Sequence, residues 1–146
     1  MATRASDISR PFEAGIETMF NDLPVIASDI IYEGSAVGDN GSGLARPLVA
    51  LDPLFGFCDR QCDNSLGAAS AKKVRVREHG KVQLSVTGVA SAADVGLLVY
   101  ASDDDTFTLT LTGNTKIGKV SRWITGTTCI VEFYADQARP PSGATD

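Results

Sequence analysis

An alternation of apolar and threonine residues between Gly96 and Val120 constrains the fold more than any other stretch of this chain. Phe107, Leu109 and Leu111 stand at every second position, and threonines fill the positions around them. A period of two places the apolar side chains on one face of a strand and the threonines on the other. A short apolar run comes before this alternation and another after it, each separated from it by Asp, Asn or Gly residues that favour turns. The stretch therefore predicts three consecutive antiparallel strands, a meander in a small all-β domain.

Two further alternating stretches predict strands over residues 73–77 and 81–86. Only Glu78, His79 and Gly80 separate them, and the glycine accepts the positive φ that a tight turn needs. We therefore expect a hairpin with His79 exposed at its tip. Gly56, inside an apolar run, predicts a β-bulge, and residues 92–95 suit one helical turn.

The chain divides into three regions by composition. Residues 1–27 form an N-terminal arm, residues 28–136 a β domain, and residues 137–146 a disordered tail rich in Pro and small residues. A short helix and an extended arm that orders on a partner are both compatible with the first region. Its apolar residues recur at helical spacing: Phe12, Ile16, Met19 and Phe20.

The 146 residues suit one domain with one core, and the net charge of -5 argues against a nucleic-acid-binding role. No apolar run approaches the roughly 20 residues that span a bilayer. The N-terminus lacks the apolar core of a signal peptide, so we expect synthesis in the cytoplasm without membrane association.

Residues suited to chemistry are sparse. The three cysteines, Cys58, Cys62 and Cys129, have neither zinc nor thioredoxin spacing, and we expect free thiols. His79 is the only histidine, and none of the common catalytic or phosphate-binding motifs is present. The sequence predicts a protein that is not an enzyme, with no metal and no cofactor.

Three polar features suggest surfaces. Residues 103–105 are all aspartate, and because they do not match a calcium loop we expect a solvated turn. The threonine row could form a flat recognition surface, although solvent-facing strand positions look the same. A third feature is a basic stripe, which predicts a solvated face or a contact with an acidic neighbour. Its residues are Lys72, Lys73, Arg75, Arg77 and, across the turn, Lys81.

Several stretches resemble the head-decoration (capsid cement) proteins of tailed bacteriophages, and the resemblance covers about residues 28–135. It is carried by strand and turn patterns at residues 28–37, 74–82, 95–105 and 112–118. The resemblance implies a compact β-barrel-like or tulip-like domain that forms homotrimers on the capsid surface of the virion. The N-terminal arms of such trimers reach onto the major capsid protein, often by adding a strand to it.

The resemblance implies a virion structural protein that clamps neighbouring major capsid proteins on the outside of the expanded capsid. Two alternatives stay open, a module that binds carbohydrate or a host surface and a structural subunit of the tail or neck. Deleting residues 1–27 is expected to leave a folded β domain that no longer binds capsids tightly. The candidate capsid-binding residues are the apolar residues of the arm: Phe12, Ile16, Met19, Phe20, Val25 and Ile26.

Overall fold

The structure, a computed structural model, describes residues 3–12 and 19–135, and its folded part is built from β-strands. A single 3₁₀ turn, η1 (Ala92–Asp94), confirms the helical turn expected there. The strands in chain order are β1 (Phe20–Pro24), β2 (Asp29–Ile31), β3 (Ala36–Asp39), β4 (Ala45–Pro47), β5 (Leu54–Cys58), β6 (Cys62–Asn64), β7 (Lys73–Arg77), β8 (His79–Thr87), β9 (Leu98–Ala101), β10 (Phe107–Thr108), β11 (Thr115–Thr125) and β12 (Thr128–Tyr134).

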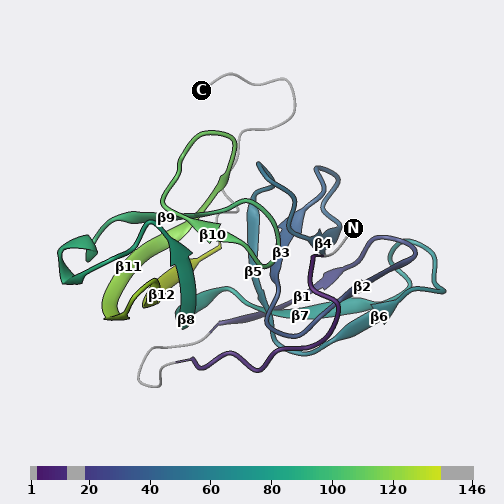
Figure 1. Ribbon diagram of the computed structural model, residues 1–146. Coiled ribbons are helices and arrows are strands. Elements are labelled where there is room, and N and C mark those ends of the chain that lie inside the picture. The colour runs from purple at the N-terminus through teal and green to yellow at the C-terminus, as the bar shows by residue number, and fades with distance from the viewer. Residues whose placement is uncertain (1–2, 13–18, 136–146) are drawn as a thin grey trace.

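Five of these strands close into a small barrel, in the order β10-β8-β12-β11-β9, seen on the left of Figure 1. Its three longest strands, β8, β11 and β12, pair in antiparallel fashion through most of their length. Val82, Leu84 and Val86 alternate along β8 and point into the barrel, with at most 2% of each exposed. The all-β class and the barrel expected from the sequence are confirmed.

A five-stranded sheet with the order β1-β7-β5-β3-β4 lies beside the barrel, on the right of Figure 1. A parallel bridge between Val25 and Ala45 joins its two outer strands, so this sheet also curls toward closure. The short pair β2–β6 lies next to it.

Strand β5 links the two halves because its side chains enter two cores. Leu54 and Phe57 belong to the barrel core, where the Phe57 ring lies 4.8 Å from that of Phe133. Phe55 and Cys58 belong to the core of the five-stranded sheet. The pairing with β3 shifts register around Gly56, whose φ is 138°, which confirms the predicted bulge.

The predicted hairpin between residues 73–77 and 81–86 is wrong in its pairing, although both strands exist. Strand β7 pairs with β1 and β5, whereas β8 pairs with β12 and β10. Only Glu78 separates them, and the chain continues extended from the sheet into the barrel instead of reversing. The backbone N–H of Glu78 donates to the Met19 carbonyl and its own carbonyl accepts from Ala135, so partners distant in sequence satisfy both groups.

The predicted meander is also corrected. Strand β9 lies between β10 and β11, and β10 pairs with β8 in parallel, so the three strands do not follow one another across the sheet. Strand β10 has only two residues, and Leu111 is 65% exposed in the loop beyond it. Because the chain leaves the sheet after Thr108, the threonine row does not form a continuous strand face.

The boundary expected at residue 27 does not separate an arm from the β domain. Strand β1 pairs with β7 along its length, and Val25 is 2% exposed within the core of the five-stranded sheet. Residues 20–25 are thus part of the folded body, and deletion of residues 1–27 would remove an edge strand and a core side chain. The expected tail, residues 137–146, lies outside the described residues.

Candidate functional site

Residues 3–12, here called the N-terminal strap, lie along the surface of the folded body and reach the barrel (Figure 1). The backbone amide of Ile8 donates to the Glu33 carbonyl over 3.0 Å. Near the end of the strap, the Pro11 carbonyl accepts a 3.0 Å hydrogen bond from the amide of Gln83 in β8. No helix is present at either contact, and residues 13–18, which carry part of the helical spacing noted in the sequence, lie outside the described residues.

Two arginines of the strap meet one carboxylate of the acidic triplet. Arg4 pairs with Asp105 over 2.9 Å, and Arg10 pairs with the other carboxylate oxygen. Arg10 also donates to the Gly34 carbonyl over 2.7 Å, and its side chain is only 9% exposed. Burial lowers the pKa of the Arg10 guanidinium, while the neighbouring Asp105 acts in the opposite direction. Charge-assisted bonds of this kind are the stronger class of hydrogen bonds.

Asp104 lies at the same contact and is 1% exposed. Its Oδ1 accepts a 2.9 Å hydrogen bond from the Thr3 amide, while its Oδ2 is buried without a hydrogen-bond partner among the described residues. Burial is the main cause that raises the pKa of Asp104, and hydrogen bonds from the strap's backbone oppose it. The expectation that residues 103–105 form a solvated turn is therefore wrong, because this turn anchors the strap.

Gly34 allows the strap to approach the body closely. Its φ is 83°, and a Cβ built on it would lie 2.5 Å from both the Cγ2 and the carbonyl oxygen of Ile8. An L-residue here would be strained in its backbone and would collide with the strap.

Phe12, the first candidate capsid-binding residue, packs within this chain. It forms an isolated bridge with Val82, and its ring lies edge-on to that of Phe133 at 6.1 Å. The Arg77 guanidinium lies 4.4 Å from the centre of the Phe12 ring. Phe12 therefore ends the strap by covering the barrel core.

Met19 and Phe20 are the candidates that face solvent, with 56% and 42% of their surfaces exposed. Phe20 begins the edge strand β1, and the Arg75 guanidinium lies 4.1 Å from its ring centre. Met19 lines a surface hollow with His79 and Tyr134.

The other three candidates differ from one another. Val25 lies in the core, so it is inaccessible to a partner in this conformation. Ile26 is partly buried, and its amide donates to the Ala45 carbonyl over 3.1 Å. Ile16 lies outside the described residues.

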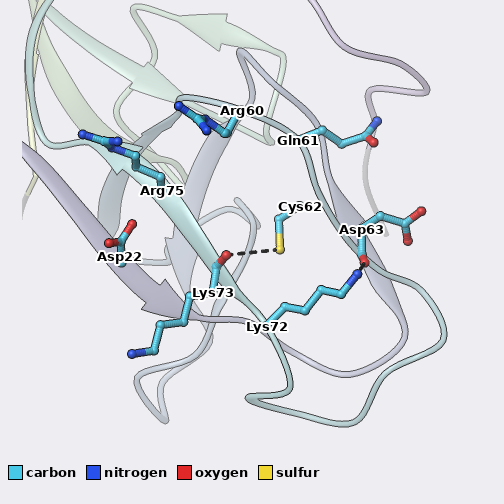
Figure 2. Close-up of a pocket in the computed structure, with 8 residues that line it drawn as sticks. All are labelled: Asp22, Arg60, Gln61, Cys62, Asp63, Lys72, Lys73 and Arg75. Atoms are coloured by element: carbon cyan, nitrogen blue, oxygen red, sulfur yellow. Dashed lines mark hydrogen bonds between the residues drawn. The ribbon is translucent and has the colours of Figure 1, made fainter.

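A second surface feature, here called the basic groove, lies over the outer face of β7 and beside the chain that enters β6 (Figure 2). Its volume is about 510 Å³, and it opens to solvent. The buried Cys62 contributes to its lining, and its thiol lies 3.6 Å from the Lys73 carbonyl. The lining residues are Asp22, Arg60, Gln61, Cys62, Asp63, Lys72, Lys73 and Arg75.

The remaining chemical candidates have structural partners. His79 lies in β8 rather than at a loop tip, and its Nε2 is 3.2 Å from a Glu132 carboxylate oxygen. All three cysteines are free and buried, as free thiols were expected. Burial raises the pKa of Cys58 to about 12 and that of Cys129 to about 11, which makes both thiols poor nucleophiles near neutral pH.

Within residues 3–12 and 19–135, no group of three or more His, Cys, Asp or Glu side chains is arranged to hold a metal ion. In the same part of the chain, no helix has the length and apolar character that crossing a bilayer requires. Comparison with models of known protein families gives no match, and a search of curated proteins finds no significantly similar sequence.

The sequence offered a signal for the strap that its interpretation missed. Three consecutive carboxylates at residues 103–105 repel one another and favour nearby cations, and the first ten residues supply Arg4 and Arg10. The spacing of these residues in the sequence does not predict the fold, which brings positions about a hundred residues apart into contact.

Proposed function

We propose that this chain is a head-decoration protein of a tailed bacteriophage, which binds the outside of the expanded capsid as a homotrimer and clamps neighbouring major capsid proteins. The observation that carries the proposal is the N-terminal strap, a segment held on a small all-β body by polar contacts to Asp104, Glu33 and Gly34 and by the packing of Phe12 on the barrel. The strand patterns that resemble this family support it from the sequence. Under this proposal the protein resides on the capsid surface.

The physical basis of the clamp is multivalency. A trimer that makes three weak contacts gains avidity because each further contact forms at high effective concentration. Extended segments bind through main-chain hydrogen bonds, which depend little on the sequence of the partner. Met19 and Phe20 are suited to apolar contact because both are exposed at the start of edge strand β1.

The test adds purified protein to expanded capsids that lack decoration, followed by sedimentation and by heating or chelator challenge. Full-length protein is expected to sediment with the capsids, to raise their resistance, and to be a trimer by analytical ultracentrifugation. A matched variant without residues 1–10 keeps Phe12 and β1, so it is expected to stay folded but to bind capsids more weakly. Failure of the full-length protein to bind or protect capsids would overturn the proposal.

Oligomeric state separates this function from its nearest alternative. A tail or neck subunit would form rings of six or twelve copies rather than trimers, and such a ring would replace the decoration proposal. The carbohydrate-binding alternative draws on the threonine face and on exposed Asp and Asn turns, but of those threonines only Thr108 lies in a strand, and Asp104 is 1% exposed. The structure therefore favours this alternative less than the decoration function.

A further inference from the structure

The basic groove concentrates positive charge on an acidic protein. Four of the chain's thirteen lysines and arginines line it, together with only two carboxylates, whereas the whole chain carries a net charge of -5. Concave surfaces lined by one sign of charge focus the field and attract ligands of the opposite sign.

The cations of the groove outnumber the carboxylates beside them, although Asp22 stands opposite Arg75 in the β1–β7 pairing. The Lys72 ammonium donates over 2.6 Å to the main-chain carbonyl of Asp63, a neutral group. The Arg75 guanidinium lies 4.1 Å from the centre of the Phe20 ring. Arg60 is 3.9 Å from Asp59, at the limit of an ion pair, and 74% of its side chain is exposed. These groups retain charge that can meet an anionic ligand.

The spacing of the groove's cations fits an extended chain. Lys73 and Arg75 occupy alternate positions on the outer face of β7. The intervening Val74 and the following Val76 point into the core. Alternate residues of any strand lie about 6.5–7 Å apart on one face. A partner segment in extended conformation, with acidic side chains at every second position, therefore matches the two cations along the strand.

We propose that the basic groove binds an extended acidic segment of a partner protein, whose alternate Asp or Glu side chains meet Lys73 and Arg75 while Arg60 lies across the groove. A nucleic acid fits less well because binding of single strands relies on aromatic side chains for base stacking, and none of the described residues that line the groove is aromatic. The nearby aromatic ring of Phe20 is already covered by the Arg75 guanidinium and is therefore not free to stack on a base. This inference is independent of the capsid proposal and holds for any partner with such a segment.

The probe is a fluorescein-labelled peptide of about eight residues in which glutamate and serine alternate, titrated with the full-length protein and followed by fluorescence anisotropy. The peptide is expected to bind at low salt and to bind more weakly as salt screens the charges. The same peptide with glutamine in place of glutamate is expected to show no binding.

Variants then locate the binding. The double change Lys73→Glu and Arg75→Glu is expected to weaken binding at least ~10-fold, because two attractions become repulsions. Asp22→Asn removes a carboxylate from the groove and is expected to strengthen binding about two- to five-fold. The control Lys116→Glu with Lys119→Glu changes the net charge equally on the exposed face of β11, and is expected to alter binding by less than about three-fold.

Opposite effects from Asp22→Asn and from the double reversal would exclude a loss of folding as the cause, and circular dichroism of each variant checks this directly. Equal weakening by the groove and β11 variants would overturn the inference, since the attraction would then be general. Equal binding of the glutamine peptide would overturn it as well. Tighter binding of a single-stranded oligonucleotide of the same charge would also overturn it and would assign the groove to nucleic acid.

Discussion

Replacing Gly34 with alanine tests whether the strap is held as the structure shows. The new methyl group would lie 2.5 Å from the carbonyl oxygen and the Cγ2 of Ile8, and the φ of 83° is unfavourable for any L-residue. Gly41 supplies a matched control, because its φ is 97° but a Cβ there would meet nothing within 4 Å. Both variants introduce backbone strain that lowers the free energy of unfolding, and only Gly34→Ala also displaces the strap.

The expected magnitudes follow from these contacts. The positive φ costs each variant about 1–2 kcal/mol of unfolding free energy. Release of the strap near Gly34 also forfeits the bond from Ile8 to Glu33 and the charge-assisted bond from Arg10, worth roughly 0.5–1.5 and 1.5–3 kcal/mol. Freed segments regain conformational entropy, which offsets part of this loss. We therefore expect Gly34→Ala to be about 1–3 kcal/mol more destabilising than Gly41→Ala.

Urea unfolding measures the two free energies, and amide hydrogen exchange by NMR locates the change. The Ile8 amide is expected to lose its protection in Gly34→Ala and to keep it in Gly41→Ala, while the Leu84 amide in the barrel stays protected in both. If Gly34→Ala were no more destabilising than the control and Ile8 remained protected, the reasoning that the strap packs against Gly34 would be refuted.

Four further predictions concern the folded body. Burial raises the pKa of Asp104 above its ordinary 3.8, so the folded protein binds a proton that the unfolded chain has already released. The free energy of unfolding therefore declines as pH rises from 3.8 through the raised native pKa. Urea unfolding across pH 4–7 is expected to show Asp104→Asn gaining stability relative to wild type as pH rises. Leu51→Asn is expected to raise stability by about 1 kcal/mol in the same assay, because Leu51 has a φ of 78° and is 71% exposed. Phe133→Ala is expected to cost about 3–5 kcal/mol, since Phe133 is fully buried between Phe57 and the other barrel side chains. The Cys58 thiol, with its pKa raised to about 12, is expected to resist iodoacetamide at pH 8 until the protein unfolds, as mass spectrometry would show.

The local pattern of the sequence predicts strands well and their partners poorly. The alternation at Val74 and Val76 correctly identifies a strand with one buried face, because a period of two depends only on neighbouring residues. Whether β7 pairs with β8 depends on Glu78, whose backbone groups bond to Met19 and Ala135. Those partners lie about sixty residues away on either side, and no local pattern encodes them.

The alternation around Phe107 fails for a related reason. Phe107 is 3% exposed, as its place in the pattern predicts, but Leu111 two steps later in the same phase is 65% exposed. Strand β10 ends because its neighbours β8 and β9 supply partners for only two of its residues. The length of a strand thus depends on the backbone partners available to it as well as on its own propensity for extended structure.

The strap connects the structure to the proposed clamp because its anchors are mainly polar. The bonds of Thr3, Ile8 and Arg10 join the strap to polar groups of the body, whereas removing β1 would uncover Val25 and the side chains around it. A neighbouring subunit that offers a free carbonyl and a carboxylate replaces these bonds at little net cost, since equal hydrogen bonds are exchanged. Effective concentration then decides between the two arrangements, and it favours the neighbour only where an assembly holds it close. Gly34→Ala, which releases the strap in the free protein, should therefore strengthen capsid binding if the strap clamps by exchange, and should leave it unchanged if Met19, Phe20 and the sheet edge carry the contact.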